Sequence, residues 1–158
     1  MEHYTFSDNL EVNYQLMVQT VKAFLDGESN MIANLSNASA IINEYVTDIN
    51  WAGFYLMENG ELVLGPFQGK PACIRIPIGH GVCGTTALQK KTMIVADVHQ
   101  FPGHIACDAA SNSEIVIPMM KNGEVFGVLD IDSPEFNRFT ALEKKYLEEV
   151  VRIIEASL

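Results

Sequence analysis

The sequence predicts an α+β fold, in which helices pack on a central six-stranded antiparallel sheet. Segments near both ends of the chain repeat apolar residues at three- and four-residue spacing, as amphipathic helices do. The segments between them alternate with a period of two, and Asn-Gly turns join some neighbours, which is typical of antiparallel hairpins. At 158 residues the chain has the length of one domain, so we expect a single domain over residues 1–158.

The expected helices span residues 7–26, 29–47, 85–90 and a last segment that starts at Thr140. The short Asp26-Gly27-Glu28 connection makes the first two an antiparallel pair. Thr140 and Glu143 have the spacing of a capping box, which opens the last helix.

The expected strands span residues 51–57, 62–64, 73–78, 92–96, 115–120 and 125–131. We expect Gly65-Pro66 to end the second strand, because proline cannot donate to a ladder of hydrogen bonds. In the third strand, Ile74, Ile76 and Ile78 should share one face. This mixed order predicts one antiparallel sheet with helices on one side and loops on the other.

The bulk charge and hydropathy exclude several classes of protein. The net charge of −10 repels phosphate backbones, so nucleic-acid binding is not expected. The chain has no run of about 18 apolar residues, so we expect no membrane span. Residues 1–8 are acidic and lack an apolar stretch, so a secretory signal is not expected either, and we predict a cytoplasmic protein.

A polar loop over residues 97–113 separates two strand-like segments and contains Cys107. Loops of about 17 residues are uncommon in compact domains unless they are functional or disordered. Phe101 and Ile105 provide apolar anchors, which disordered segments lack. We therefore interpret this loop as functional.

The cysteines are Cys73, Cys83 and Cys107, and all lie in or beside loops marked by glycine or proline. An odd number in a reducing compartment argues against a structural disulfide framework. Small buried hydrophobes are the simplest interpretation of each cysteine. Histidines lie nearby in the sequence, but the Cys-x-x-Cys pairs of structural zinc sites are absent, so we predict no metal.

Three carboxyl groups should meet on one face of the sheet. Asp130 and Asp132 are two residues apart on a strand, and Glu114 begins the neighbouring strand. Such a cluster should raise the pKa of at least one carboxyl, leaving a protonated acid beside an ionised one. For Asp132 alone, a water-facing position at the strand end is the simpler interpretation.

The glycine-rich turn over residues 79–84 leads into the short helix. Free backbone N–H groups at such a turn can bind an anion, such as a substrate carboxylate. A tight connection with no ligand explains the glycines equally well, and the sequence leaves both interpretations open.

Several motifs together resemble one family. They are Asn-Trp-Ala-Gly-Phe-Tyr at residues 50–55, Gly-Pro-Phe-Gln-Gly-Lys-Pro-Ala-Cys at 65–73, Gly-His-Gly-Val-Cys-Gly at 79–84, and Phe-Pro-Gly-His-Ile-Ala-Cys-Asp-Ala-Ala-Ser-Asn-Ser-Glu at 101–114. The order of elements resembles a GAF domain. The motifs are similar to those of the free methionine-(R)-sulfoxide reductases, a GAF-domain family, over essentially the whole chain.

The resemblance implies an enzyme that reduces the R sulfoxide of free methionine, with thioredoxin as the reductant and no cofactor. It assigns attack on the substrate to Cys107, resolution to Cys73 and a secondary part to Cys83. It also implies a substrate pocket lined by Trp51, Tyr55, Glu114, Asp130 and Asp132. The expected intermediates are a sulfenic acid and then a disulfide.

Trp51 and Tyr55 are four residues apart on a strand, so they share a face. An aromatic wall there would suit an S-methyl group or a cation, although core packing is the commoner use of such a pair. His80 and His104 fit either the pocket or a surface loop.

The main alternative is a GAF module that binds a small ligand without turnover; the cysteine set argues against it. A homodimer would be supported by the apolar faces of the terminal helices, and dimers are common among GAF domains.

Overall fold

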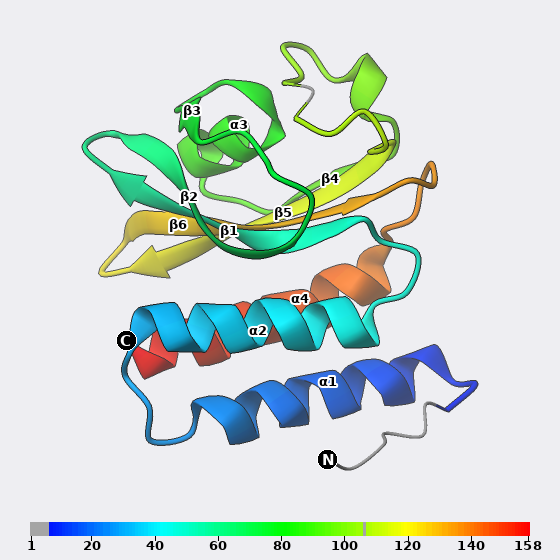
Figure 1. Cartoon of the computed structure of the whole chain (residues 1–158), viewed down its shortest axis with the longest axis vertical. Helices are drawn as coiled ribbons and strands as arrows, with labels where there is room; N and C mark the ends of the chain where they lie inside the picture. Colours follow the sequence, from blue (N-terminus) through cyan, green and yellow to red (C-terminus); the bar gives the residue numbers. More distant parts are fainter. Residues whose placement is uncertain (1–6, 106) are drawn as a thin grey trace.

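The computed structural model describes residues 7–105 and 107–158, so the expected start of the domain at residue 1 lies outside the described residues. Within this part of the chain, four α-helices and one six-stranded antiparallel sheet are arranged in layers (Figure 1). The predicted α+β class and the antiparallel sheet are confirmed. None of the described helices is long and apolar enough to span a membrane.

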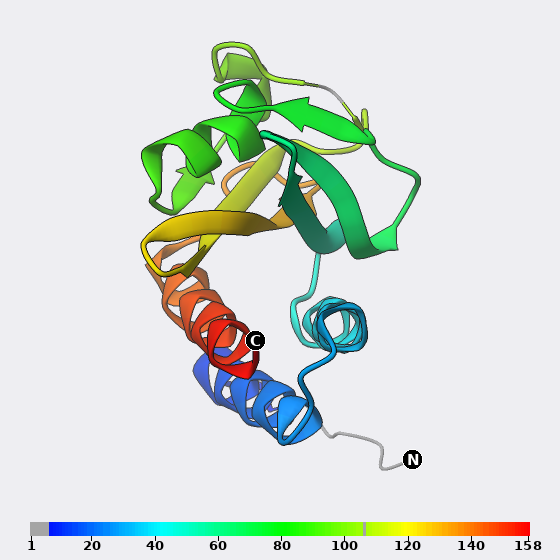
Figure 2. The same cartoon turned by 90° about the vertical axis from the view of Figure 1, so that its left-hand side faces the viewer.

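The sheet has the strand order β3-β2-β1-β6-β5-β4. Its strands are β1 (Trp51–Glu58), β2 (Glu61–Gly69), β3 (Arg75–Pro77), β4 (Met93–Val95), β5 (Ser113–Lys121) and β6 (Glu124–Ser133). The β1–β2 and β5–β6 hairpins turn at Asn59-Gly60 and Asn122-Gly123, where all four residues have positive φ, as such turns require. Figure 2 shows the sheet curling around its upper face.

Three helices cover one face of the sheet. They are α1 (Leu10–Leu25), α2 (Met31–Tyr45) and α4 (Ala141–Ser157). In Figure 1, α2 and α4 lie against the sheet, α2 on β1 and β2 and α4 on β5, while α1 packs beneath both helices as an outer layer. The predicted capping box at Thr140 and Glu143 is present, with both reciprocal hydrogen bonds. The main apolar core fills this side, with Met17, Leu35 and Leu129 fully buried in it.

The opposite face carries the long loops, as expected, and also α3 (Gly81–Gln89), which the expected arrangement had not placed there. α3 begins at Gly81 instead of residue 85, because the last four residues of the glycine-rich turn are already helical. A second apolar cluster lies here, and it includes Trp51, Tyr55 and Cys83.

The second strand does not end at Gly65-Pro66, as the sequence had suggested. β2 continues to Gly69 because the β1–β2 register shifts between Gly53 and Tyr55, which pair with Phe67 and Leu64. Pro66 falls within this irregularity, where a missing N–H does not interrupt the ladder.

The third strand is shorter than expected. β3 covers Arg75–Pro77 only, and of the three isoleucines expected on one face, Ile76 and Ile78 pack against the same apolar cluster whereas Ile74 does not. Ile76 is buried, whereas Ile74 is 66% exposed. Cys73 consequently lies in a loop before the strand and not within it.

A buried polar network joins α1 to α4, the first and last helices of the chain. The Tyr14 hydroxyl in α1 donates a 2.7 Å hydrogen bond to Glu143 Oε2 in α4, and the Arg138 guanidinium lies 3.6 Å from the same carboxylate. Burial alone would raise the pKa of Glu143, but hydrogen bonds from Thr140 and Tyr14, with the Arg138 charge, outweigh it and lower that pKa. The ionised carboxylate therefore stabilises the fold.

Replacing Tyr14 by Phe should lower the free energy of unfolding at neutral pH by about 1.5–3 kcal/mol, because it removes a buried hydrogen bond to a charged group. Since the native pKa of Glu143 is lowered, this contribution is complete above the unfolded-state pKa and is lost as the pH falls through the native value. Urea unfolding at neutral and acidic pH measures both effects. Tyr146→Phe is the matched control, because Tyr146 donates to the exposed Glu11; an equal loss in both variants would contradict the assignment.

Candidate active site

A pocket lies between the curled face of the sheet, α3 and the loop that joins β4 to β5. Its cavity has a volume of about 50 Å³, room for a few water molecules. All the residues predicted for the site contribute to its lining except Cys73, which reaches the pocket only through its bond to Cys107. The lining residues that matter for the argument are Trp51, Tyr55, Cys83, Cys107, Glu114, Asp130 and Asp132.

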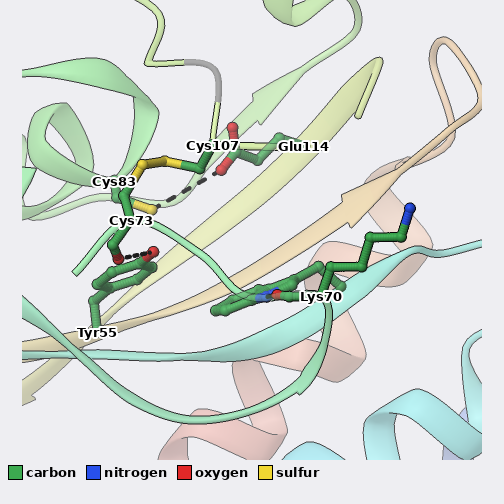
Figure 3. Close-up of a disulfide and its surroundings, with 7 residues drawn as sticks. Tyr55, Lys70, Cys73, Cys83, Cys107 and Glu114 are labelled. Carbon is green, nitrogen blue, oxygen red and sulfur yellow. Dashed lines mark hydrogen bonds between the residues drawn. A yellow bond between two sulfur atoms is a disulfide. The ribbon is translucent and has the colours of Figure 1, made fainter. Parts of the chain in front are cut away.

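Cys73 and Cys107 form a disulfide, with their Cα atoms 5.4 Å apart (Figure 3). The bond joins the loop between β2 and β3 to the loop between β4 and β5, although the two residues are 34 positions apart. Both cysteines are partly exposed, so an external thiol can approach them. The two cysteines to which attack and resolution were assigned are therefore bonded to each other, and Cys107 lines the pocket.

Cys83 is the remaining cysteine, and it is a buried free thiol. It lies in the first turn of α3, and its Sγ donates a weak 3.9 Å hydrogen bond to Glu114 Oε2. Burial, and then the neighbouring Asp130, Glu114 and Asp132 carboxyls, raise the pKa of this thiol well above its ordinary value. Cys83 is therefore a neutral thiol at neutral pH, and a poor nucleophile.

The carboxyl groups meet because of the register of three strands. Asp132 in β6 pairs with Glu114 in β5 on one side and with Trp51 in β1 on the other, so these side chains form one row across the sheet. Asp130 lies two residues along β6, on the same face. The common face expected from the strand period is thus present, and Glu114 and Asp130 are each only 6% exposed.

Burial is the main cause of the altered acidity of this cluster. It raises the pKa of Glu114 and of Asp132 well above the ordinary values, and repulsion from Asp130 adds to both. The pKa of Asp130 is also raised by burial, although hydrogen bonds with Glu114 and Cys83 oppose the change. Carboxyls this close in a buried site cannot all be ionised, so at least one holds a proton near neutral pH.

An aromatic wall borders the carboxyl row. Trp51 stacks on Phe67 and Tyr55, with ring centroids 5.1 and 5.9 Å apart. Gly53 makes this possible, because a Cβ there would lie 2.2 Å from the Cβ of Phe67. The Tyr55 hydroxyl donates a 2.9 Å hydrogen bond to the carbonyl of Cys73 (Figure 3), which ties the wall to the disulfide loop. The sequence did not point to Phe67 because the second strand was expected to end at residue 64, five residues before its actual end at Gly69.

The loop residues Asp108 and Ser111 also line the pocket, and the sequence analysis did not single them out. Asn50 Nδ2 donates to the carboxylate of Asp108 and to the hydroxyl of Ser111, each at 3.0 Å. The Asp108 carboxylate accepts a second bond from the N–H of Ala110. Both residues belong to the motif at residues 101–114, which could have indicated them, but only Cys107 and Glu114 in that motif had been given a chemical role.

His80 and His104, whose positions the sequence left open, both line the pocket. His104 Nδ1 is buried and has no hydrogen-bond partner among the described residues. Burial, and then the nearby His99, lower its pKa, so the ring is neutral at neutral pH. His99 instead bonds the side chain of Asn112 outside the pocket.

The glycine-rich turn places the start of α3 against the pocket. The N–H groups of Gly79, His80 and Gly84 donate to backbone carbonyls, so they are already used. The N–H groups at the first turn of the helix, Gly81 to Cys83, have no partner within α3 and border the cavity. These are the N–H groups available to an anion.

Comparison with known proteins places the chain in a family. The model of the GAF domain matches residues 33–158. The chain is 54% identical over 136 residues to the free methionine-R-sulfoxide reductase of Escherichia coli, covering 86% of this chain and 82% of that protein. It is 45% identical to the enzyme of the same name from Saccharomyces cerevisiae, covering 99% and 92%.

A solved structure of free methionine-R-sulfoxide reductase from Neisseria meningitidis in complex with its substrate is similar throughout. It superimposes with a TM-score of 0.93 at 39% identity and covers 99% of this chain and 94% of that one. Identity at this level over nearly the full length establishes the family, as the motifs had indicated. The chain belongs to the free methionine-R-sulfoxide reductase family of GAF domains.

Proposed function

We propose that this protein reduces free L-methionine (R)-S-oxide to L-methionine. One observation carries the proposal: Cys107, which forms a disulfide with Cys73, lines the same small pocket as a buried cluster of carboxyl groups. Reduction of a sulfoxide by a thiol needs both components, a thiolate that attacks sulfur and an acid that protonates the departing oxygen.

In the first step, the Cys107 thiolate attacks the sulfoxide. The oxygen passes from the methionine sulfur to the cysteine sulfur, so methionine is released and Cys107 becomes a sulfenic acid. Cys107 is the better candidate for this attack because it is partly exposed at the pocket, whereas Cys83 is buried and held neutral. The two electrons that reduce the sulfoxide come from the Cys107 sulfur.

In the second step, Cys73 condenses with the sulfenic acid. Its thiol forms the disulfide with Cys107, and the sulfenic oxygen leaves as water. An external dithiol must then exchange with this bond, and we infer that thioredoxin in the cytoplasm supplies it. The partial exposure of both cysteines supports direct access of such a reductant.

The acid cluster takes two parts in this mechanism. A protonated carboxyl of Glu114, Asp130 or Asp132 donates to the sulfoxide oxygen, and an ionised member of the cluster holds the substrate ammonium group. Trp51 and Tyr55 border the S-methyl group. The substrate carboxylate accepts hydrogen bonds from the free N–H groups at the start of α3.

This arrangement explains a preference for the free amino acid. The sulfoxide group is the same in a protein, so selectivity must come from the ammonium and carboxylate groups at the other end of the substrate. Closure of the loop that carries Cys107 over both charges would leave no exit for a peptide chain. A homodimer formed through the terminal helices remains compatible with this pocket, because those helices cover the opposite face of the sheet.

A count of thiols separates an enzyme from a ligand-binding module. The reduced protein, unfolded in denaturant, should titrate three thiols. After one equivalent of the R sulfoxide is added to the native reduced protein, it should titrate one, which mass spectrometry should place on Cys83. A count that stays at three would indicate binding without turnover.

Cys107→Ser should abolish methionine formation even in a single turnover, because a serine hydroxyl at neutral pH is a far weaker nucleophile toward sulfur. Rapid-quench detection of methionine checks this. A stoichiometric burst of methionine from the variant would show that another cysteine makes the attack, with Cys83 the next candidate.

Cys73→Ser should retain the first turnover but lose thioredoxin-driven cycling, because the sulfenic acid forms before the disulfide. A dimedone-type reagent should label Cys107 in this variant, and peptide mass spectrometry locates the label. Label on Cys83, or cycling at the parent rate, would overturn the order of steps.

N-acetyl-methionine sulfoxide should be a poor substrate, because acetylation removes the ammonium charge. The loss of a buried charge-assisted contact costs about 2–5 kcal/mol, so kcat/KM should fall roughly 30-fold or more. Methionine sulfoxide methyl ester, which loses the other charge, is the companion substrate. Equal rates on free and acetylated sulfoxide would restrict the cluster to proton transfer.

A further inference from the structure

A thiol and two carboxyl groups in the pocket lie close enough together to bind one ion, a property that the proposed reduction does not use. They belong to Cys83, Glu114 and Asp130. One donor atom from each, the thiol sulfur and two carboxylate oxygens, lies within 4.8 Å of the others. The three residues come from α3, β5 and β6, so residues distant in the sequence converge here. All three are buried, Cys83 being 5% exposed.

A second observation at the same place points to a missing ligand. Asp130 Oδ1 is buried and has no hydrogen-bond partner among the described residues. The residue as a whole is only 6% exposed. A buried carboxylate oxygen without a partner is costly, and such groups are rare in folded proteins. The side chain borders the cavity, so a small ligand can reach it.

The donor set selects the kind of ligand. One sulfur and two carboxylate oxygens suit a borderline-soft dication better than Mg²⁺ or Ca²⁺, which prefer oxygen alone. The donor atoms of a tetrahedral zinc site lie about 3.3–3.7 Å apart, given the usual bond lengths. If the carboxylate oxygens moved by about 1 Å, these three donor atoms would reach that spacing. The cavity beside the three residues has room for a water molecule as the fourth ligand.

We propose that Cys83, Glu114 and Asp130 bind a thiophilic divalent cation, Zn²⁺ in the cell, and that the cation blocks the substrate pocket. Binding breaks the Cys83 S–H bond and releases that proton, with any carried by the carboxyl groups, and no electron is transferred. The blocking effect rests on the proposed function, because the cation occupies the carboxyl groups that would meet the sulfoxide oxygen. The cation is an inhibitor and not a cofactor. The sequence did not predict it because its ligands form no Cys-x-x-Cys pair.

The disulfide form of the protein isolates this site from a competing one. In the reduced protein, Cys73 and Cys107 are a dithiol that can chelate metal by itself. In the oxidised protein both are consumed and Cys83 is the free thiol. A thiolate–metal signal in the oxidised protein must therefore come from Cys83.

The experiment is a titration of the oxidised protein with Cd²⁺, followed by the ultraviolet thiolate-to-cadmium charge-transfer band and by calorimetry. The band should rise to one equivalent of cadmium. Cys83→Ser should abolish the band, and Asp130→Asn should keep the thiol but weaken binding about tenfold or more. Asp108→Asn is the matched control, because it removes a carboxylate from the same pocket without touching the cluster, and its affinity should stay close to that of the parent.

The outcomes separate the proposal from its alternatives. Absence of the band in the oxidised protein, or metal binding that appears only after reduction, would assign the metal to the Cys73–Cys107 dithiol and overturn the proposal. Parent-like affinity in a folded Asp130→Asn variant would remove the cluster as the site. Binding is measured without turnover, so a protein that binds cadmium but reduces no sulfoxide would contradict only the proposed function.

Free methionine sulfoxide should weaken cadmium binding to the oxidised protein; if it does not, the blocking effect is wrong.

Discussion

β6 hydrogen-bonds to β1 along one edge and to β5 along the other, and this double pairing determines which side chains meet. It aligns Trp51, Asp132 and Glu114 in one row and places Asp130 beside them. A slip of one residue in either pairing would turn these side chains to the helical face, where Ile115 and Ile131 are now buried. The apolar core on one face therefore holds the register that assembles the polar site on the other.

The two faces of the sheet divide stability from chemistry. The helical face buries the larger apolar cluster, and its polar groups are paired, as the Tyr14–Glu143 hydrogen bond illustrates. The opposite face buries carboxyl groups with raised pKa values and a thiol that stays neutral. Burying these groups destabilises the fold, and the apolar core on the helical face must compensate for that cost. Carboxyl groups with raised pKa values are typical of sites that transfer protons. The disulfide links the loop between β2 and β3 to the loop between β4 and β5 on this side of the sheet.

Local periodicity was sufficient to predict the elements and part of the site. The alternation of residues along β6 predicted that Asp130 and Asp132 share a face, and the Asn-Gly turns predicted both hairpins. The contact between Cys83 and Glu114 was beyond prediction because it depends on how α3 sits on the sheet, and the helix itself begins four residues earlier than its pattern suggested. Phe67 was missed for a related reason, since a local rule about proline ignored a register shift that accommodates it. Asp108 and Ser111 carry no periodic signal at all.

In the proposed mechanism, the carboxyl groups, the aromatic wall and Cys107 would meet a small sulfoxide from fixed directions, so the reaction should depend on the chirality of the sulfur. The most direct test is a single turnover of the reduced protein with each purified epimer of free methionine sulfoxide, monitored by methionine release. The account predicts stoichiometric methionine from the R epimer, accompanied by the Cys73–Cys107 disulfide, and none from the S epimer. Equal release from both epimers, or release without that disulfide, would contradict it.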